Sequence, residues 1–175
     1  AYHEKLSAAA HHHHWRLRLG VLAGDEARKP SVAELMGSSE CVMLTSIQEG
    51  FGLPYLEAAA ASRPLIARSL PNIAPDLDHF GFRFPQAYDE ILVSPGFFDW
   101  PAERTRQQKR FNEWRATMPV FARTRVAQPL LLETQHPVAV PFSRLTLTAQ
   151  LEVLAHPARE SWAACAALNP FLSSW

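Results

Sequence analysis

The sequence is poor in glycine and cysteine and has no net charge. Only seven glycines and two cysteines occur in 175 residues. Cys41 and Cys165 form no metal-ligand or redox spacing, so we expect both thiols to be small core residues in a reducing compartment. Seventeen Lys and Arg balance seventeen Asp and Glu. No overall field therefore draws the chain to nucleic acid or to an anionic membrane.

Several functional signatures are also missing. No apolar run approaches the roughly 20 residues that a membrane-spanning helix needs, and no secretory leader is recognisable. A phosphate-loop lysine signature, a Gly-x-Ser-x-Gly elbow and paired cysteines are absent, which argues against the commonest competing nucleotide and hydrolase classes. We expect a cytoplasmic protein. Because the chain begins with Ala1 instead of Met, we also expect a fragment.

Residues 1–95 alternate between helix and strand signals, which favours an α/β fold with a parallel sheet and crossover helices. We expect helices over 2–10, 32 to about 37 and 53 to about 62, strands over 17–22, 41–44, 64–67 and 82–84, and a turn over 23–25. Ser31 and Glu34 have the spacing of a capping box, and Gly37 would provide a left-handed stop. The apolar run 41–44 predicts a central strand that is buried on both faces.

Residues 96–175 have a different character and predict a helix-rich extension packed on the same lobe. A helix is expected over 99–118, with an apolar stripe at Phe111, Trp114 and Met118. The proline-bounded stretch 137–141 predicts an edge strand or a loop. Two further helices are expected, one capped by Ser143 with an inward face of Leu147, Leu151 and Leu154, and one from Pro157 with Trp162 and Cys165 facing inward.

The segment from Thr45 to Glu57 carries the chemistry. It reads as the end of a strand, a loop with Gly50 and Gly52, and the start of a helix at Leu53-Pro54. Glycines allow a ligand to approach the backbone closely, and free N–H groups at a helix start attract anions. These features predict a diphosphate site.

Two glutamates flank this predicted site. Glu57 lies four residues beyond Leu53, about 6 Å along a helix axis, which is roughly the span from a diphosphate to the hydroxyls of its ribose. Glu49 precedes the helix and would face the sugar on the other side. Carboxylates bind hydroxyl groups through charge-assisted hydrogen bonds. An ordinary turn glutamate and a solvated helix glutamate are the structural alternatives.

In Glu49-Gly50-Phe51-Gly52-Leu53-Pro54 and Leu56-Glu57-Ala58, the chain resembles the retaining glycosyltransferases of the group 1 or family 4 type. This family includes bacterial mannosyl- and glucosyltransferases, and its members have the two-lobed GT-B fold. The resemblance covers residues 31 to about 77 and implies a C-terminal nucleotide-sugar-binding lobe. It implies Glu49 as the catalytic residue that contacts the donor hexose, with donor binding by Ser46, Glu49, Gly50, Phe51, Gly52, Leu53 and Glu57.

The chain departs from the family pattern at three places. Ser62-Arg63-Pro64 stands where Gly usually precedes the proline, and Leu70-Pro71-Asn72 replaces a Gly-Gly loop. The Arg and Lys pair that neutralises the diphosphate has no counterpart here. The resemblance implies no metal and no cofactor, because the nucleoside-diphosphate sugar is a substrate. It also implies an unidentified acceptor and a missing N-terminal lobe as partners.

Other features have structural readings that we favour. His11 to His14 are taken as a surface tract and not as a metal site. The basic face of the helix over 99–118 is taken as solvated, in preference to contact with an anionic membrane or a phosphorylated acceptor. The alanines after Glu57 are taken as close packing of a helix on the sheet, with no chemical role.

The expected function is retaining transfer of a hexose from a nucleoside diphosphate to an acceptor hydroxyl. One rival is an enzyme of the same fold, such as a nucleotide-sugar epimerase or a glycan phosphorylase, and product analysis with a labelled donor separates these. The other rival is a non-catalytic nucleotide-binding or interaction module, which would bind without turnover or would not bind at all.

Overall fold

The computed structural model describes residues 2–23 and 29–174, and most of the turn expected over 23–25 lies outside these ranges. Residues 14–90, together with 173 and 174, form one compact unit, which we call the sheet unit. Residues 2–13 and 91–172 form a second, the helical unit. The sequence predicts a domain boundary between residues 95 and 96, and the structure divides the chain between residues 90 and 91. The first helix groups with the helical unit because it packs against a helix near the C-terminus.

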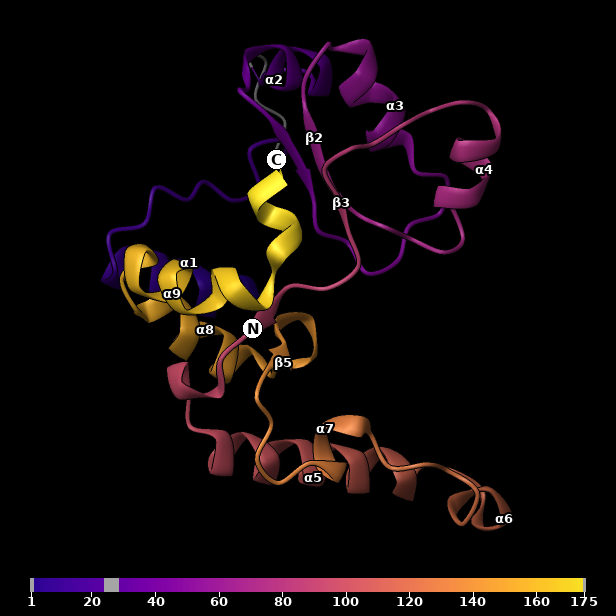
Figure 1. Cartoon of the computed structure of the whole chain (residues 1–175), viewed down its shortest axis with the longest axis vertical. Coiled ribbons are helices and arrows are strands. Elements are labelled where there is room, and N and C mark those ends of the chain that lie inside the picture. Colours follow the sequence, from indigo (N-terminus) through magenta and orange to yellow (C-terminus); the bar gives the residue numbers. More distant parts are fainter. Residues whose placement is uncertain (1, 24–28, 175) are drawn as a thin grey trace. The chain divides into compact units, whose positions relative to one another are not determined.

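The sheet unit is an α/β structure with a small parallel sheet. Its strands are β1 (Val42–Leu44), β2 (Leu65–Arg68) and β3 (Ala87–Tyr88), in the order β1-β2-β3. The helices α3 (Leu53–Ala60) and α4 (Ala74–His79) make the connections between successive strands, and α2 (Val32–Ser38) precedes β1. Figure 1 shows the three strands side by side near α2 and α3.

The core of the sheet unit lies between the sheet and α3. In β2, Leu65 and Ala67 are buried while Ile66 and Arg68 are half-buried. The buried cluster consists of Leu44, Tyr55, Ala58, Leu65, Ala67, Leu70, Ile73 and Leu77. Ala58 is fully buried, so a small residue lets α3 approach the strands closely.

The prediction that residues 41–44 form a central, doubly buried strand is wrong. β1 is an edge strand, and the side chain of Met43 is 63% exposed. The middle strand is β2, which was expected over 64–67 and is confirmed within one residue. An apolar run fixes the extended conformation but does not show which strand has two neighbours.

The capping box of α2 and the end of this helix near Gly37 are confirmed, but the expected left-handed stop at Gly37 is wrong. Glu34 N–H donates to Ser31 Oγ at 3.1 Å, and Ser31 N–H donates to Glu34 Oε2 at 2.7 Å. The helix runs to Ser38, and Gly37 is not among the positive-φ residues. The Ser38 and Ser39 hydroxyls donate to carbonyl oxygens of the last turn. Because these carbonyls are satisfied, no left-handed residue is needed.

Two expected strands are also wrong. Residues 17–22 form no strand, and neither do residues 82–84. The N–H groups of Gly81 and Phe82 donate to carbonyls of Asp78 and Leu77, so this segment closes the end of α4. The strand β3 follows instead at Ala87–Tyr88.

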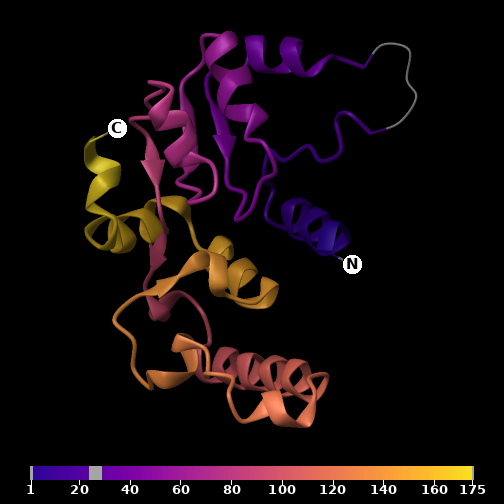
Figure 2. The same ribbon diagram turned by 90° about the vertical axis from the view of Figure 1, so that its right-hand side faces the viewer.

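The helical unit contains α1 (Tyr2–His12), α5 (Trp100–Ala116), α6 (Val120–Arg123), α7 (Leu130–Glu133), α8 (Leu147–Ala155) and α9 (Ala158–Cys165). Short 3₁₀ helices are η1 (Pro95–Phe97), η2 (Phe142–Arg144), η3 (Ala166–Leu168) and η4 (Pro170–Ser174). Strands β4 (Leu92–Val93) and β5 (Val140–Pro141) pair antiparallel. α7 lies along α5 (Figure 1 and Figure 2).

The first helix and the helix expected over 99–118 are confirmed as α1 and α5, and Asp99 caps α5 through Ala102 N–H. The predicted cap of α8 is wrong, since Ser143 lies in η2 and Thr146 is the N-cap. The inward face of α8 is also different, because Ala149 and Val153 are its buried residues.

The last predicted helix is confirmed in position but not in its inward face. α9 begins directly after Pro157. Trp162 is 56% exposed, whereas Cys165 packs against the core of the helical unit. The stripe predicted on α5 is confirmed only at Phe111, because Trp114 is 49% exposed.

Candidate functional site

The loop between β1 and α3 is shaped by the glycine that precedes the helix. Gly52 is the N-cap of α3 and has left-handed backbone angles, with φ at 68° and ψ at 28°. Tyr55 N–H donates to Gly52 O at 3.0 Å and closes the first turn. Pro54 lies in the same turn, where its lack of an N–H leaves no donor unpaired.

The amides at the start of α3 are free to donate. In the described part of the chain, the N–H groups of Gly50, Phe51, Gly52 and Leu53 have no hydrogen-bond acceptor. They lie at the N-terminal end of an eight-residue helix, whose dipole places partial positive charge at this end. The sequence predicted this group of donors, and such a group has the chemistry of an anion site.

The two glycines of the loop have different surroundings. A Cβ on Gly52 would lie 2.7 Å from Cγ2 of Ile73, so this position has a packing reason to be glycine. A Cβ on Gly50 would meet nothing within 4 Å, and Gly50 is not among the positive-φ residues. Packing and backbone conformation thus explain the glycine at position 52, whereas neither explains the glycine at position 50.

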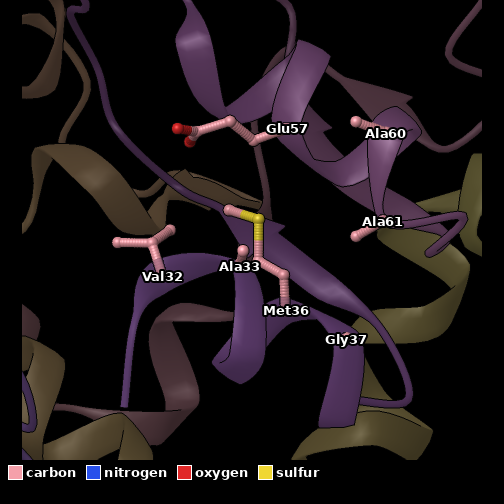
Figure 3. Close-up of a pocket in the computed structure, with 7 residues that line it drawn as sticks. All are labelled: Val32, Ala33, Met36, Gly37, Glu57, Ala60 and Ala61. Atoms are coloured by element: carbon pink, nitrogen blue, oxygen red, sulfur yellow. The ribbon is translucent and has the colours of Figure 1, made fainter. Parts of the chain in front are cut away.

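Glu57 lines a pocket of about 260 Å³ between α2 and α3. The other lining residues are small or apolar, namely Val32, Ala33, Met36, Gly37, Ala60 and Ala61. In Figure 3, Met36 points from α2 toward α3, and the Glu57 carboxylate extends from α3 on the side of Val32. Among the described residues, the Glu57 carboxylate has no hydrogen-bond or ion-pair partner. An unpaired carboxylate thus stands at an apolar pocket.

Glu49 lies in a different environment from Glu57. Its carbonyl oxygen accepts a hydrogen bond from Asn72 Nδ2 at 2.9 Å. Burial raises the pKa of the Tyr55 hydroxyl, and the charge of Glu49 raises that pKa further. Glu49 is half-buried and does not line the pocket that contains Glu57. The structure therefore places the two glutamates at opposite ends of the loop-helix segment, without bringing them into one pocket.

The remaining predicted donor-binding residues are Ser46, Phe51 and Leu53. Ser46 is half-buried. Phe51 and Leu53 are 89% and 57% exposed. Two exposed apolar side chains therefore flank the free amides.

Sequence reasoning missed two contributors to this region. Asn72, in the loop that follows β2, joins that loop to the loop after β1. Both loops follow the carboxyl ends of parallel strands, where α/β sheets form ligand crevices. The second is the face of α2 with Val32, Ala33 and Met36. The sequence signal for this face is the run of small residues after Glu57. The prediction gives these residues a packing role alone, whereas Ala60 and Ala61 also line the pocket.

The described residues contain neither a metal-ligand cluster nor a membrane-spanning helix. Within residues 2–23 and 29–174, no group of three or more His, Cys, Asp or Glu is arranged to hold a metal ion. No helix in the same ranges has the length and apolar character to cross a membrane. Comparisons with protein-family models, curated proteins and solved structures give no match.

Proposed function

We propose that the sheet unit is a Rossmann-like lobe of the GT-B type that binds a nucleoside-diphosphate sugar. The topology of the sheet supports this proposal. A parallel sheet with crossover helices presents the loops after β1 and β2 at one sheet edge, which is where such folds bind nucleotides. The sequence resemblance to retaining glycosyltransferases falls on the same loop and helix.

One observation carries the proposal, namely a free carboxylate and a set of free amides on the same short helix. The amides of residues 50–53 lie at the N-terminal end of α3, and Glu57 follows one turn later at the wall of the pocket. In the proposal, the amides bind the diphosphate and Glu57 accepts hydrogen bonds from the ribose hydroxyls. The apolar wall formed by Val32, Ala33 and Met36 would contact the nucleoside.

The chemistry that follows is electrostatic. When the bond from the hexose to the diphosphate breaks, negative charge grows on the departing phosphate oxygen. Amides that already point at this position stabilise that charge without reorganising. Glu49 would hold the hexose hydroxyls and position its anomeric carbon, which makes it the proposed catalytic residue. The oxygen of the acceptor hydroxyl would then bond to the anomeric carbon on the face that the diphosphate leaves, which retains the configuration, and the hydroxyl proton would pass to the departing phosphate oxygen.

Calorimetry tests the ribose contact. Uridine, guanosine and adenosine diphosphates are titrated into the whole chain, and Glu57→Ala is compared with the wild type. We expect binding weaker by about 1–3 kcal/mol, the usual scale for a hydrogen bond to a charged group. Glu160→Ala is the matched control, because Glu160 lies on α9 of the helical unit and is exposed. Equal affinities for wild type and Glu57→Ala would refute the assignment of Glu57 to the ribose.

A second variant probes the diphosphate. A Cβ on Gly50 meets no atom of the protein, so Gly50→Ala should leave the fold intact. If the diphosphate approaches this backbone, the added methyl group will weaken binding of every nucleoside diphosphate to a similar extent. Undiminished binding by Gly50→Ala would mean that the ligand does not approach Gly50.

A further inference from the structure

A second concave region, the arginine groove, lies within the helical unit. It has a volume of about 650 Å³, which is within the range of small-molecule sites. α5 contributes Arg110, Phe111 and Trp114, and the end of η2 contributes Arg144 with the following Leu145. All of these residues lie outside the sheet unit, so the groove is independent of the proposed donor site.

The two arginines of the groove are not engaged by the protein. Arg106 of α5 pairs with the buried Glu103 at 2.9 Å, and Arg104 donates to a backbone carbonyl. In the described part of the chain, the guanidinium groups of Arg110 and Arg144 have neither a hydrogen bond nor an ion pair. No acidic residue lines the groove. Two unpaired guanidinium groups therefore offer donors to an anion.

Aromatic rings form the apolar part of the groove. Phe111 is 8% exposed and belongs to the core, whereas the neighbouring indole of Trp114 is 49% exposed. Their ring centroids are 6.0 Å apart, with the planes tilted by 38°. A half-exposed indole beside a buried phenyl ring offers a surface for a planar or apolar group. The ligand that fits both features has an anionic end and an apolar end.

A hydrogen-bond network around the buried Glu103 fixes the two sides of the groove to each other. Gln107 Nε2 donates to Glu103 Oε1 at 2.7 Å and to the carbonyl oxygen of Arg144 at 2.8 Å. Glu103 is fully buried and also accepts from Thr146 N–H at 2.8 Å. The backbone of η2 is thus tied to α5. Because both arginines start from fixed backbone positions, less ordering is required when a ligand binds.

We propose that the arginine groove binds an organic phosphate monoester whose organic part is planar or apolar. A phosphate monoester carries a charge of about −1.5 to −2 at neutral pH, which matches two guanidinium groups better than a carboxylate does. The phosphate would contact Arg110 and Arg144, and the organic part would contact Trp114.

Calorimetry with three probes tests the ligand class. Phenyl phosphate contains both elements, inorganic phosphate only the anion, and phenol only the ring. We expect phenyl phosphate to bind most tightly and phenol not to bind measurably. The variant Arg110→Gln/Arg144→Gln should weaken phenyl phosphate by roughly tenfold or more. The matched control is Arg16→Gln/Arg18→Gln, which removes two exposed arginines of the sheet unit.

The site of binding is read from Trp114 by NMR. The indole N–H signal of Trp114, assigned from Trp114→Phe, should shift on addition of phenyl phosphate. A second arm replaces the probe by vesicles of phosphatidylcholine with and without phosphatidic acid. Binding only to the phosphatidic-acid vesicles, and only with Arg110 and Arg144 intact, would identify a lipid headgroup as the source of the same phosphate.

Three results would overturn the proposal. One is that neither phenyl phosphate nor the phosphatidic-acid vesicles bind saturably. Another is an equal loss of binding in both arginine pairs, which would indicate nonspecific charge attraction. The third is full binding by Arg110→Gln/Arg144→Gln. None of these results bears on Glu57 or the nucleoside diphosphates, so this proposal and the proposed function fail separately.

Discussion

Replacing Gly52 by alanine separates a structural role of this glycine from a ligand-binding role. Gly52 has φ at 68°, and an L-residue in this conformation costs about 1–2 kcal/mol. The new Cβ would also lie 2.7 Å from Cγ2 of Ile73 and 3.3 Å from Cδ2 of Tyr55. Ile73 and Tyr55 are only 4% and 2% exposed, so neither side chain has space to move aside.

The expected effect is the sum of these two contributions. Overpacking a core costs about 1–3 kcal/mol, and with the backbone cost we expect Gly52→Ala to lower the free energy of unfolding by about 2–5 kcal/mol. Urea denaturation followed by far-ultraviolet circular dichroism measures this change. Gly50→Ala is the matched control and should be neutral or slightly stabilising, because its Cβ meets nothing and the unfolded chain loses entropy.

A double-mutant cycle with Ile73→Ala tests the steric part. Removing the Ile73 side chain eliminates the 2.7 Å contact, so Gly52→Ala should cost less in that background by about 1 kcal/mol or more. Equal effects of Gly52→Ala and Gly50→Ala would refute the reasoning altogether. If the effects of Gly52→Ala and Ile73→Ala are additive, the steric contact makes no contribution and backbone strain alone accounts for the cost of Gly52→Ala. A loss of nucleotide binding in Gly52→Ala could follow from misfolding, so Gly50→Ala is the better probe of the ligand.

Two further predictions concern the helical unit. Burial raises the pKa of Glu103, but hydrogen bonds from Thr146, Gln107 and Arg106 outweigh it and hold the pKa below its ordinary value of 4.5. Its contribution to stability is therefore present above pH 4.5 and is lost as the pH falls through the lowered pKa. Glu103→Gln should lower the free energy of unfolding by about 1–3 kcal/mol at pH 7. In urea titrations at decreasing pH, the difference in this free energy between wild type and variant should shrink, and a difference independent of pH would contradict this. Asn169 is 1% exposed and pairs with both the N–H and the carbonyl of Leu92 at 2.8 and 2.7 Å. Asn169→Leu should cost about 1–3 kcal/mol for each backbone group left unpaired, and an unchanged urea midpoint would rule out this role.

Local features of the fold could be predicted from the sequence. The capping box of Ser31 and Glu34 formed as expected, and so did α3 behind Leu53-Pro54 and α5 behind Asp99. Each depends on residues within about one helical turn, so the necessary information is contiguous. The free amides before α3 follow from the same local geometry.

Features that depend on distant residues were not predicted correctly. The apolar run at Val42–Leu44 became an edge strand because β3 forms beside β2 and not beside β1. The N-cap of α8 is Thr146 and not the predicted Ser143. The N–H and hydroxyl of Thr146 both donate to Glu103, 43 residues earlier. A local sequence pattern gives no information about a hydrogen-bond partner so far away in the chain.

The candidate site shows the same division. The position of Glu57, one turn into a helix behind a glycine loop with free amides, could be predicted because helix starts are set by adjacent residues. Two features of the site depend on the folded unit: α2 supplies the opposite wall of the Glu57 pocket, and Asn72 joins the Glu49 loop. These contacts bring together residues 20 or more positions apart, and such neighbours are selected by packing of the whole unit, not by local conformational preference.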